Sequence, residues 1–206
     1  MKRKYNFLAN EEIDENNIIE NSEVYCDNNH IYFYSDVTIR SCFILNIKIN
    51  ELIKKLKKIS IDYDHTSPNI YLHINSYGGD LFASFSVIDT IINSDIPIVS
   101  IIEGTAASAA TLISIVCQKR LMTSNSFMLI HQLSSGSCGK YEELKDEYIN
   151  DTKLMNLLYK LYLKYTKMNL KKIKKILKRD IWLNYEESLK YGLIDEIYSK
   201  KIKKSN

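Results

Sequence analysis

Ser108, His131 and Asp180 carry the side-chain types that nucleophilic acyl transfer requires. A serine hydroxyl becomes a nucleophile when an imidazole accepts its proton and a carboxylate orients that imidazole. Backbone N–H groups beside the serine must then stabilise the oxyanion that forms on the attacked carbonyl. In isolation, each residue also has an ordinary structural explanation: an N-cap serine, a surface histidine and an exposed aspartate. Whether these three residues form a catalytic site therefore depends on the predicted elements around them.

Ser108 lies where a buried strand is predicted to turn into a helix. The apolar run at 97–102 predicts the strand, Gly104 marks the turn, and the small and apolar residues at 107–116 predict the helix. The N-terminus of that helix offers unpaired backbone N–H groups and the positive end of the helix dipole. Small residues on both sides of Ser108 leave room for a substrate carbonyl.

His131 and the pair Gly78-Gly79 lie at two other strand ends. His131 follows the apolar strand predicted at 127–130, and the glycines follow the strand predicted at 70–75. Parallel α/β sheets place reactive groups at the ends of their strands. The N–H groups of a glycine turn can also face an oxyanion. Both features therefore fit the chemistry that Ser108 would need.

The order of the predicted elements indicates an α/β fold with a parallel sheet covered by helices. A strand, a glycine turn and a helix follow one another twice, at 70–92 and 97–116. The long helix predicted at 141–166 should protrude or pack between subunits, because little sequence remains to cover it. The other predicted elements are a strand at 31–34, helices at 47–59 and 170–178, a helix opened by an Asn184–Glu187 capping box and ended by Gly192, and a strand at 193–198.

The length of 206 residues predicts one folded domain. We assign it to residues 30–198, preceded by a flexible arm at 1–29 and followed by a basic tail at 199–206. The 28 Lys and Arg residues against 25 Asp and Glu leave a net charge of +3, too small to indicate nucleic acid as a partner. The Lys cluster at 171–178 is interpreted as a solvated helix face.

Several classes of site are not expected. The cysteines have no CxxC spacing and the histidines are scattered, so we expect no metal site and reduced thiols. The glycines at 136–141 lack the spacing of a phosphate loop, and no cofactor is expected. No apolar stretch follows the basic start of the chain, and the apolar run at 96–117 contains Pro97 and Glu103, so we expect no signal peptide, no membrane span and a cytoplasmic protein.

Five segments, taken together, resemble the Clp protease proteolytic subunit family (ClpP) over residues 31–198. This resemblance implies the ClpP/crotonase-like fold of repeated β-β-α units, with 141–166 as the protruding handle helix. The segments are Ile-Asn-Ser-Tyr-Gly-Gly at 74–79, Gly-Thr-Ala-Ala-Ser at 104–108, Met-Leu-Ile-His-Gln at 128–132, Arg-Asp at 179–180, and 187–195, which ends in Tyr-Gly-Leu-Ile-Asp.

The resemblance implies that Ser108 is the nucleophile, His131 the general base and Asp180 the acid that orients the imidazole. It also implies an oxyanion hole formed by the backbone N–H groups of Gly78 and Ala109. An extended substrate would pair with two backbone segments as an added strand. Those segments comprise Gly79, Asp80 and Leu81 on one side and Leu133, Ser134 and Ser135 on the other.

The resemblance further implies an assembly: homo-oligomeric rings of seven subunits, stacked as a tetradecamer around a chamber. The implied substrates are unfolded polypeptides, delivered by a separate AAA+ unfoldase that uses ATP. No nucleic acid or membrane partner is implied.

The sequence departs from the family pattern at several positions without losing a catalytic side chain. Tyr77 and Leu133 stand where the family usually has proline, and Ala109 replaces a methionine. Lys178 replaces an acidic residue that takes part in ring-to-ring pairing. Tyr71 keeps an aromatic of the unfoldase docking strand, but His73 occupies the next aromatic position.

These departures bear on the partner and the assembly more than on the chemistry. Two alternatives therefore stay open: a non-catalytic structural or regulatory ring subunit, and a ClpP-like maturation protease that needs no ATPase. Hydratases of the crotonase type share the fold but need no Ser–His–Asp set.

Overall fold

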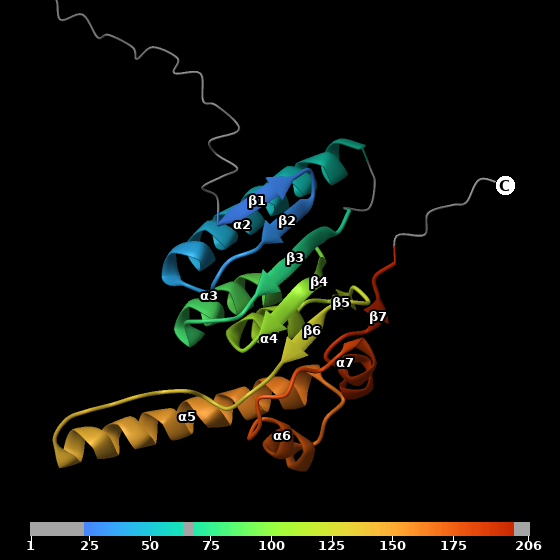
Figure 1. The fold of residues 1–206 in the computed structure, drawn as a ribbon. Coiled ribbons are helices and arrows are strands. Elements are labelled where there is room, and N and C mark those ends of the chain that lie inside the picture. Colours follow the sequence, from blue (N-terminus) through green and yellow to red (C-terminus); the bar gives the residue numbers. More distant parts are fainter. Residues whose placement is uncertain (1–22, 64–67, 200–206) are drawn as a thin grey trace, which may run out of the picture.

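A seven-stranded sheet organises the chain, and every strand pair in it except β1–β2 is parallel (Figure 1). The structure is a computed structural model, and it describes residues 23–63 and 68–199. The order is β1-β2-β3-β4-β5-β7, and β6 pairs with the end of β4. The predicted parallel α/β sheet is confirmed. Its strands are β1 (Val24–Asp27), β2 (His30–Phe33), β3 (Ile70–Ser76), β4 (Ile98–Ala107), β5 (Lys119–Met122), β6 (Phe127–Leu129) and β7 (Glu196–Ile197).

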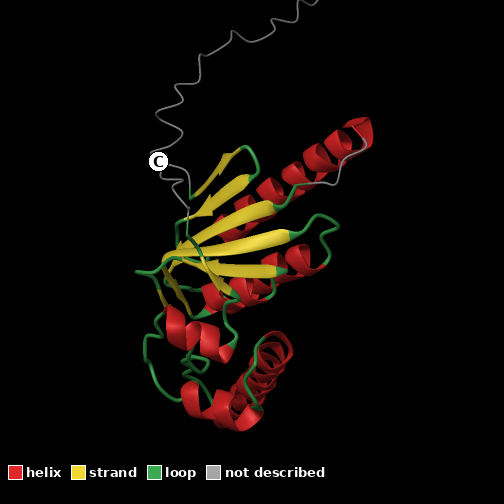
Figure 2. Cartoon of the chain, turned by 90° about the vertical axis from the view of Figure 1, so that its right-hand side faces the viewer, coloured by secondary structure: helices red, strands yellow, loops and turns green. Residues whose placement is uncertain are grey.

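The helices lie mainly on one face of this sheet (Figure 2). Helices α2 and α4 contact the strands, and α3 packs against both of them. Helix α5 contacts α4 and α6 near one end and extends away from the sheet, as Figure 1 shows. The helices are α2 (Ile39–Tyr63), α3 (Leu81–Ile92), α4 (Ala109–Ile115), α5 (Tyr141–Tyr165), α6 (Leu170–Ile176) and α7 (Tyr185–Tyr191).

Alternation along β3 shows how the core forms. Ile70, Leu72 and Ile74 are fully buried and belong to the same apolar cluster as the buried apolar residues of α3. Because neighbouring side chains of a strand point to opposite faces, Tyr71 and His73 lie on the other face of the sheet. Burial of the apolar face holds β3 centrally between β2 and β4, and so fixes where the Gly78-Gly79 turn emerges.

Several elements differ from the sequence-based expectation. Residues 24–27, assigned to the flexible arm, form β1 and pair with β2, while residues 1–22 and 200–206 lie outside the described residues. Strand β5 was not predicted, because Lys119 and Arg120 hide its apolar character. Strand β4 continues through Gly104, where φ is 83°, and does not end there as expected.

Helix α2 begins earlier than predicted because two hydroxyl side chains cap it. Thr38 Oγ1 accepts a hydrogen bond from the Ser41 N–H at 3.0 Å, and Ser41 Oγ accepts one from the Thr38 N–H at 2.9 Å. This reciprocal pairing satisfies backbone donors at the helix start. None of the helices in residues 23–63 and 68–199 is long and apolar enough to cross a membrane.

Candidate active site

Ser108 occupies a strained turn between β4 and α4. Its φ of 53° and ψ of −126° are unusual for a residue other than glycine, and such conformations cost about 1–3 kcal/mol. Hydrogen bonds hold the turn: the Ser108 N–H donates to Leu129 O at 2.8 Å, and Ser108 O accepts from the Thr111 N–H at 3.0 Å. The Ser108 hydroxyl does not cap α4. Ser108 therefore occupies the N-cap position of α4 without capping the helix through its side chain.

Gly78 packs its backbone directly against the Ser108 turn. A Cβ atom at Gly78 would lie 2.6 Å from Ala107 O, 2.7 Å from Ser108 Cβ and 3.0 Å from Ala109 N. Only glycine fits this approach, and its φ of 94° is also one that glycine adopts without strain. The Gly78 N–H donates to Ser76 Oγ at 3.2 Å, so an oxyanion would have to replace that acceptor.

Gly79 presents an open backbone edge to the pocket. Gly78 O accepts from the Val37 N–H at 2.8 Å, and the Asp80 N–H donates to Val37 O at 2.7 Å. Because hydrogen-bonding groups alternate along an extended strand, the N–H and C=O of Gly79 point away from Val37. Asp80 also caps α3, since its Oδ1 accepts from the Ala83 N–H at 2.7 Å.

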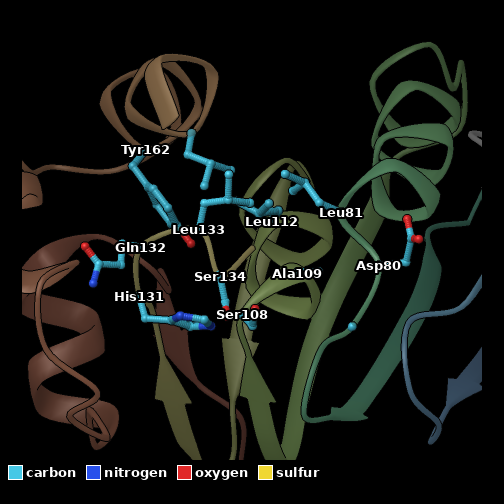
Figure 3. A pocket seen from close by; sticks show the side chains of 12 residues that line it. Asp80, Leu81, Ser108, Ala109, Leu112, His131, Gln132, Leu133, Ser134 and Tyr162 are labelled. Atoms are coloured by element: carbon cyan, nitrogen blue, oxygen red, sulfur yellow. The ribbon is translucent and has the colours of Figure 1, made fainter. Parts of the chain in front are cut away.

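His131 shares a pocket of about 240 Å³ with Ser108. Figure 3 shows its imidazole pointing toward Ser108. The half-buried ring follows the end of β6, and among the described residues no hydrogen bond joins it to the Ser108 hydroxyl. Of the residues expected in the site, the pocket gathers Gly79, Asp80, Leu81, Ser108, Ala109, His131, Leu133 and Ser134, while Gly78 packs against its nucleophile turn.

The backbone of Asp180 lies beside that of His131, but within the described residues its carboxylate makes no hydrogen bond or ion pair. Met128 and Leu183 exchange backbone hydrogen bonds of 2.9 and 2.7 Å, and the Gln132 N–H donates to Leu177 O at 2.7 Å. These bonds align the segment that carries Asp180 antiparallel to the segment that carries His131. Asp180 is nevertheless exposed and does not line the pocket, and within the described residues it makes no hydrogen bond with His131.

The segment after His131 runs extended along α5. The Leu133 N–H points to Met155 Sδ at 3.1 Å, and the Ser135 hydroxyl donates to the Asp151 carboxylate. A thioether is a weak acceptor, so the Leu133 N–H is held only loosely. Ser135 does not line the pocket, in contrast to Leu133 and Ser134.

Four further side chains build the apolar side of the pocket or its support, and sequence reasoning did not single them out for the site. Leu112 lies on α4, and Leu158 and Tyr162 come from α5. The phenol of Tyr162 is buried against Thr111 of α4. Burial raises the pKa of Tyr162 above its ordinary range, and the hydrogen bond with Thr111 offsets part of that rise. The helical periodicity of α5 marked Tyr162 as an apolar position without indicating what it faces.

A metal centre is not formed by the residues that the structure describes, since no three His, Cys, Asp or Glu side chains gather where they could hold an ion. What the site does contain is a serine in a strained turn, an imidazole facing it and backbone donors beside it. That combination suits acyl transfer.

Comparisons with known proteins agree with this geometry. The family model described as Clp protease matches residues 32–201. An ATP-dependent Clp protease proteolytic subunit of Treponema denticola is 36% identical over 155 residues, which are 74% of this chain and 77% of that protein. The corresponding subunit of Streptococcus mutans is also 36% identical over 155 residues, or 72% and 76% of the two chains.

A solved structure shares the fold. A ClpP1 mutant from Listeria monocytogenes superimposes with a TM-score of 0.73, covering 85% of this chain and 94% of that one, at 21% sequence identity.

Proposed function

The chain belongs to the Clp protease family, and on this premise we propose that it is a serine endopeptidase that hydrolyses peptide bonds of unfolded polypeptides. One observation carries the proposal: the hydroxyl of Ser108, held in a strained turn, is not used to cap α4 and faces the pocket that His131 also lines. A core or cap serine would have its hydroxyl engaged locally.

In the proposed reaction, Ser108 Oγ attacks the substrate carbonyl while His131 accepts the hydroxyl proton. The N–H groups of Gly78 and Ala109 donate to the oxyanion, for which the Gly78 N–H leaves Ser76 Oγ. His131 then returns the proton to the leaving amine, and a water molecule, deprotonated by His131, hydrolyses the acyl-enzyme. Asp180 orients the imidazole after its side chain turns toward His131.

The substrate lies extended across Ser108. The N–H and C=O of Gly79 pair with its backbone on one side, and the segment from Leu133 to Ser135 pairs with it on the other. Leu112, Leu158 and Tyr162 surround the space next to Ser108. An apolar substrate side chain fits there, because a charged one would lose hydration without gaining a partner.

The protease assembles as homo-oligomeric heptameric rings, stacked as a tetradecamer. The support for this part of the proposal is the protruding half of α5, where Tyr141 and Tyr148 are 74% and 75% exposed and Leu144 and Ile149 are also exposed. Large apolar side chains in one exposed stretch of helix are typical of contacts between subunits. Packing of these helices between copies would close a chamber around the Ser108 pockets.

An AAA+ unfoldase delivers the substrate in this proposal, although the docking strand has an unusual composition. His73 is buried, with its Nε2 2.8 Å from His30 Nδ1 and its Nδ1 3.1 Å from Glu103 Oε1. Tyr32 stacks on His73 and Tyr71 on His30. The face therefore keeps half-buried aromatic rings around a polar centre. Degradation of a folded substrate that requires ATP and an added unfoldase would separate this arrangement from that of an ATPase-independent maturation protease.

The decisive experiment replaces the nucleophile. Ser108→Ala should abolish labelling by a fluorophosphonate probe and cleavage of a fluorogenic peptide, while Ser124→Ala, in an exposed turn, should leave both unchanged. Native mass spectrometry should show the same assembly for both variants. Peptide cleavage that persists in Ser108→Ala would overturn the proposed nucleophile.

The exposed carboxylate of Asp180, which does not line the pocket, favours one competing function, that of a non-catalytic ring subunit. Failure of the folded, assembled wild-type protein to react with the fluorophosphonate would support that function. Labelling of Ser108 at a rate well above that of free serine would exclude it.

A further inference from the structure

A buried pair of hydroxyl groups connects α5 to the main chain of the nucleophile. Thr111 Oγ1 lies 2.6 Å from Ser108 O and 2.8 Å from the Tyr162 hydroxyl. Thr111 is fully buried and Tyr162 is 2% exposed. Thr111 belongs to α4 and Tyr162 to α5, so the contact joins two residues that are 51 positions apart in the chain.

The chemistry of the three groups sets the direction of this hydrogen-bond chain. Ser108 O is a carbonyl oxygen and can only accept, so the single hydroxyl proton of Thr111 points to it. Thr111 Oγ1 must then accept from Tyr162, whose phenol is the donor. The hydrogen-bond chain runs from Tyr162 through Thr111 to Ser108, and each hydroxyl donates its proton to one acceptor.

The same turn needs support from both sides, because Ser108 has a φ of 53°. On the amino side, the Ser108 N–H is held by Leu129 O at 2.8 Å. On the carboxyl side, Ser108 O takes both the N–H and the hydroxyl of Thr111, at 3.0 and 2.6 Å. Strained conformations persist where the surroundings hold them from several directions. Tyr162 fixes the rotamer of the hydroxyl that supplies one of these bonds.

Tyr162 also lines the pocket with its ring, as Figure 3 shows. One side chain therefore forms part of the pocket wall and holds the nucleophile turn. The two roles are separable, because the phenol oxygen contacts Thr111 whereas the ring lines the pocket.

We propose that Tyr162 is a positioning residue for the nucleophile, acting through Thr111 on the backbone of Ser108. The inference rests on the proposed serine peptidase function and adds to it a residue of α5. As a consequence, the position of α5 affects the nucleophile turn through the hydrogen bonds from Tyr162 to Thr111 and from Thr111 to Ser108 O.

The test removes the phenol oxygen and keeps the ring. Tyr162→Phe should lower kcat for a fluorogenic peptide, and the rate of fluorophosphonate labelling, by about fivefold, the factor expected for one neutral hydrogen bond. KM should stay within twofold of wild type, because the ring still lines the pocket. The matched control is Tyr159→Phe on the same helix, whose ring lies 5.3 Å from the Lys174 ammonium, and it should leave both constants unchanged.

Substitutions of Thr111 test the direction of the chain. Thr111→Ser keeps the hydroxyl and should retain most of kcat, whereas Thr111→Val should lower kcat at least as much as Tyr162→Phe. Combining Tyr162→Phe with Thr111→Val should add little to the loss from Thr111→Val, because both break one chain. Circular dichroism melts and native mass would identify any variant that is unfolded or disassembled.

The outcomes separate this inference from the proposed function. A Tyr162→Phe variant with wild-type kcat and labelling rate, or with only KM changed, would overturn the positioning role alone. Additive effects in the double variant would do the same. A folded wild-type protein that is neither labelled nor active would overturn the proposed function, and the positioning role with it.

Discussion

Gly78→Ala is the sharpest test of how the nucleophile turn is built. The new methyl group would lie 2.6 Å from Ala107 O, 2.7 Å from Ser108 Cβ and 3.0 Å from Ala109 N. Two of these neighbours are backbone atoms of the β4–α4 turn, which cannot rotate out of the way. The turn itself must therefore move, and Ala109 N, the second proposed oxyanion donor, moves with it.

The magnitude has two parts. Alanine at a φ of 94° costs about 1–2 kcal/mol in backbone strain, before any cost of displacing the turn. We therefore expect the free energy of unfolding to fall by about 2 kcal/mol or more. Loss of one oxyanion donor typically lowers kcat by about 10²–10³-fold, and we expect a loss of about this size for Gly78→Ala.

The assay combines peptide hydrolysis with urea denaturation. Gly136→Ala is the matched control, since no atom lies within 4 Å of a Cβ at that position and the residue is exposed. It should change the free energy of unfolding by less than about 0.5 kcal/mol and leave kcat unchanged. A folded Gly78→Ala protein with kcat within threefold of wild type would refute the proposed oxyanion geometry.

Two other predictions concern groups outside the pocket. Burial raises the pKa of Asp195, but hydrogen bonds from the Arg120 guanidinium and backbone N–H outweigh it and hold this pKa below its ordinary value. The pKa of Asp195 is therefore lower in the folded than in the unfolded chain, so its stabilising effect is present at neutral pH and is lost as the pH falls through the folded-state pKa. Asp195→Asn should flatten the acid limb of the stability–pH curve measured by urea denaturation. An unchanged acid limb would contradict this. Burial raises the pKa of the Cys117 thiol to about 12, whereas Cys138 is exposed. Mass spectrometry after brief iodoacetamide treatment at pH 8 should find Cys138 alkylated and Cys117 intact until urea unfolds the chain; modification at equal rates would show that Cys117 is accessible.

Helices whose limits depend on neighbouring residues could be predicted from the sequence. Helix α3 was predicted with its observed bounds, and α7 with its Asn184–Glu187 capping box and its end at Gly192. Apolar periodicity, capping side chains and a left-handed glycine act within a few residues, so they can be recognised in sequence. Strand β5 could not be recognised this way. Arg120 is polar, and it is accommodated because its guanidinium donates to Asp195, which follows it by 75 positions, and to the carbonyls of Tyr165 and Gly192.

For the site, the chemical groups and the turns that carry them can be recognised in the amino-acid sequence. The local sequence indicates a strand, small residues and a helix start around Ser108. It also indicates a strand end before His131 and a glycine turn at 78 and 79. They indicated a serine, an imidazole and backbone donors at the ends of parallel strands. The positive φ of Ser108 was not visible, because serine adopts that conformation only where neighbouring segments hold it.

Which of these groups meet depends on how segments far apart in the chain pack together. The hydrogen bonds of Gln132 and Leu183 bring the chain of Asp180 beside that of His131, yet leave the carboxylate exposed. The packing of α5 on α4 buries the Tyr162 phenol against Thr111. Such contacts depend on the order of the strands and on which face of a helix turns inward, and both are set by burial of the whole core and not by spacing along the chain.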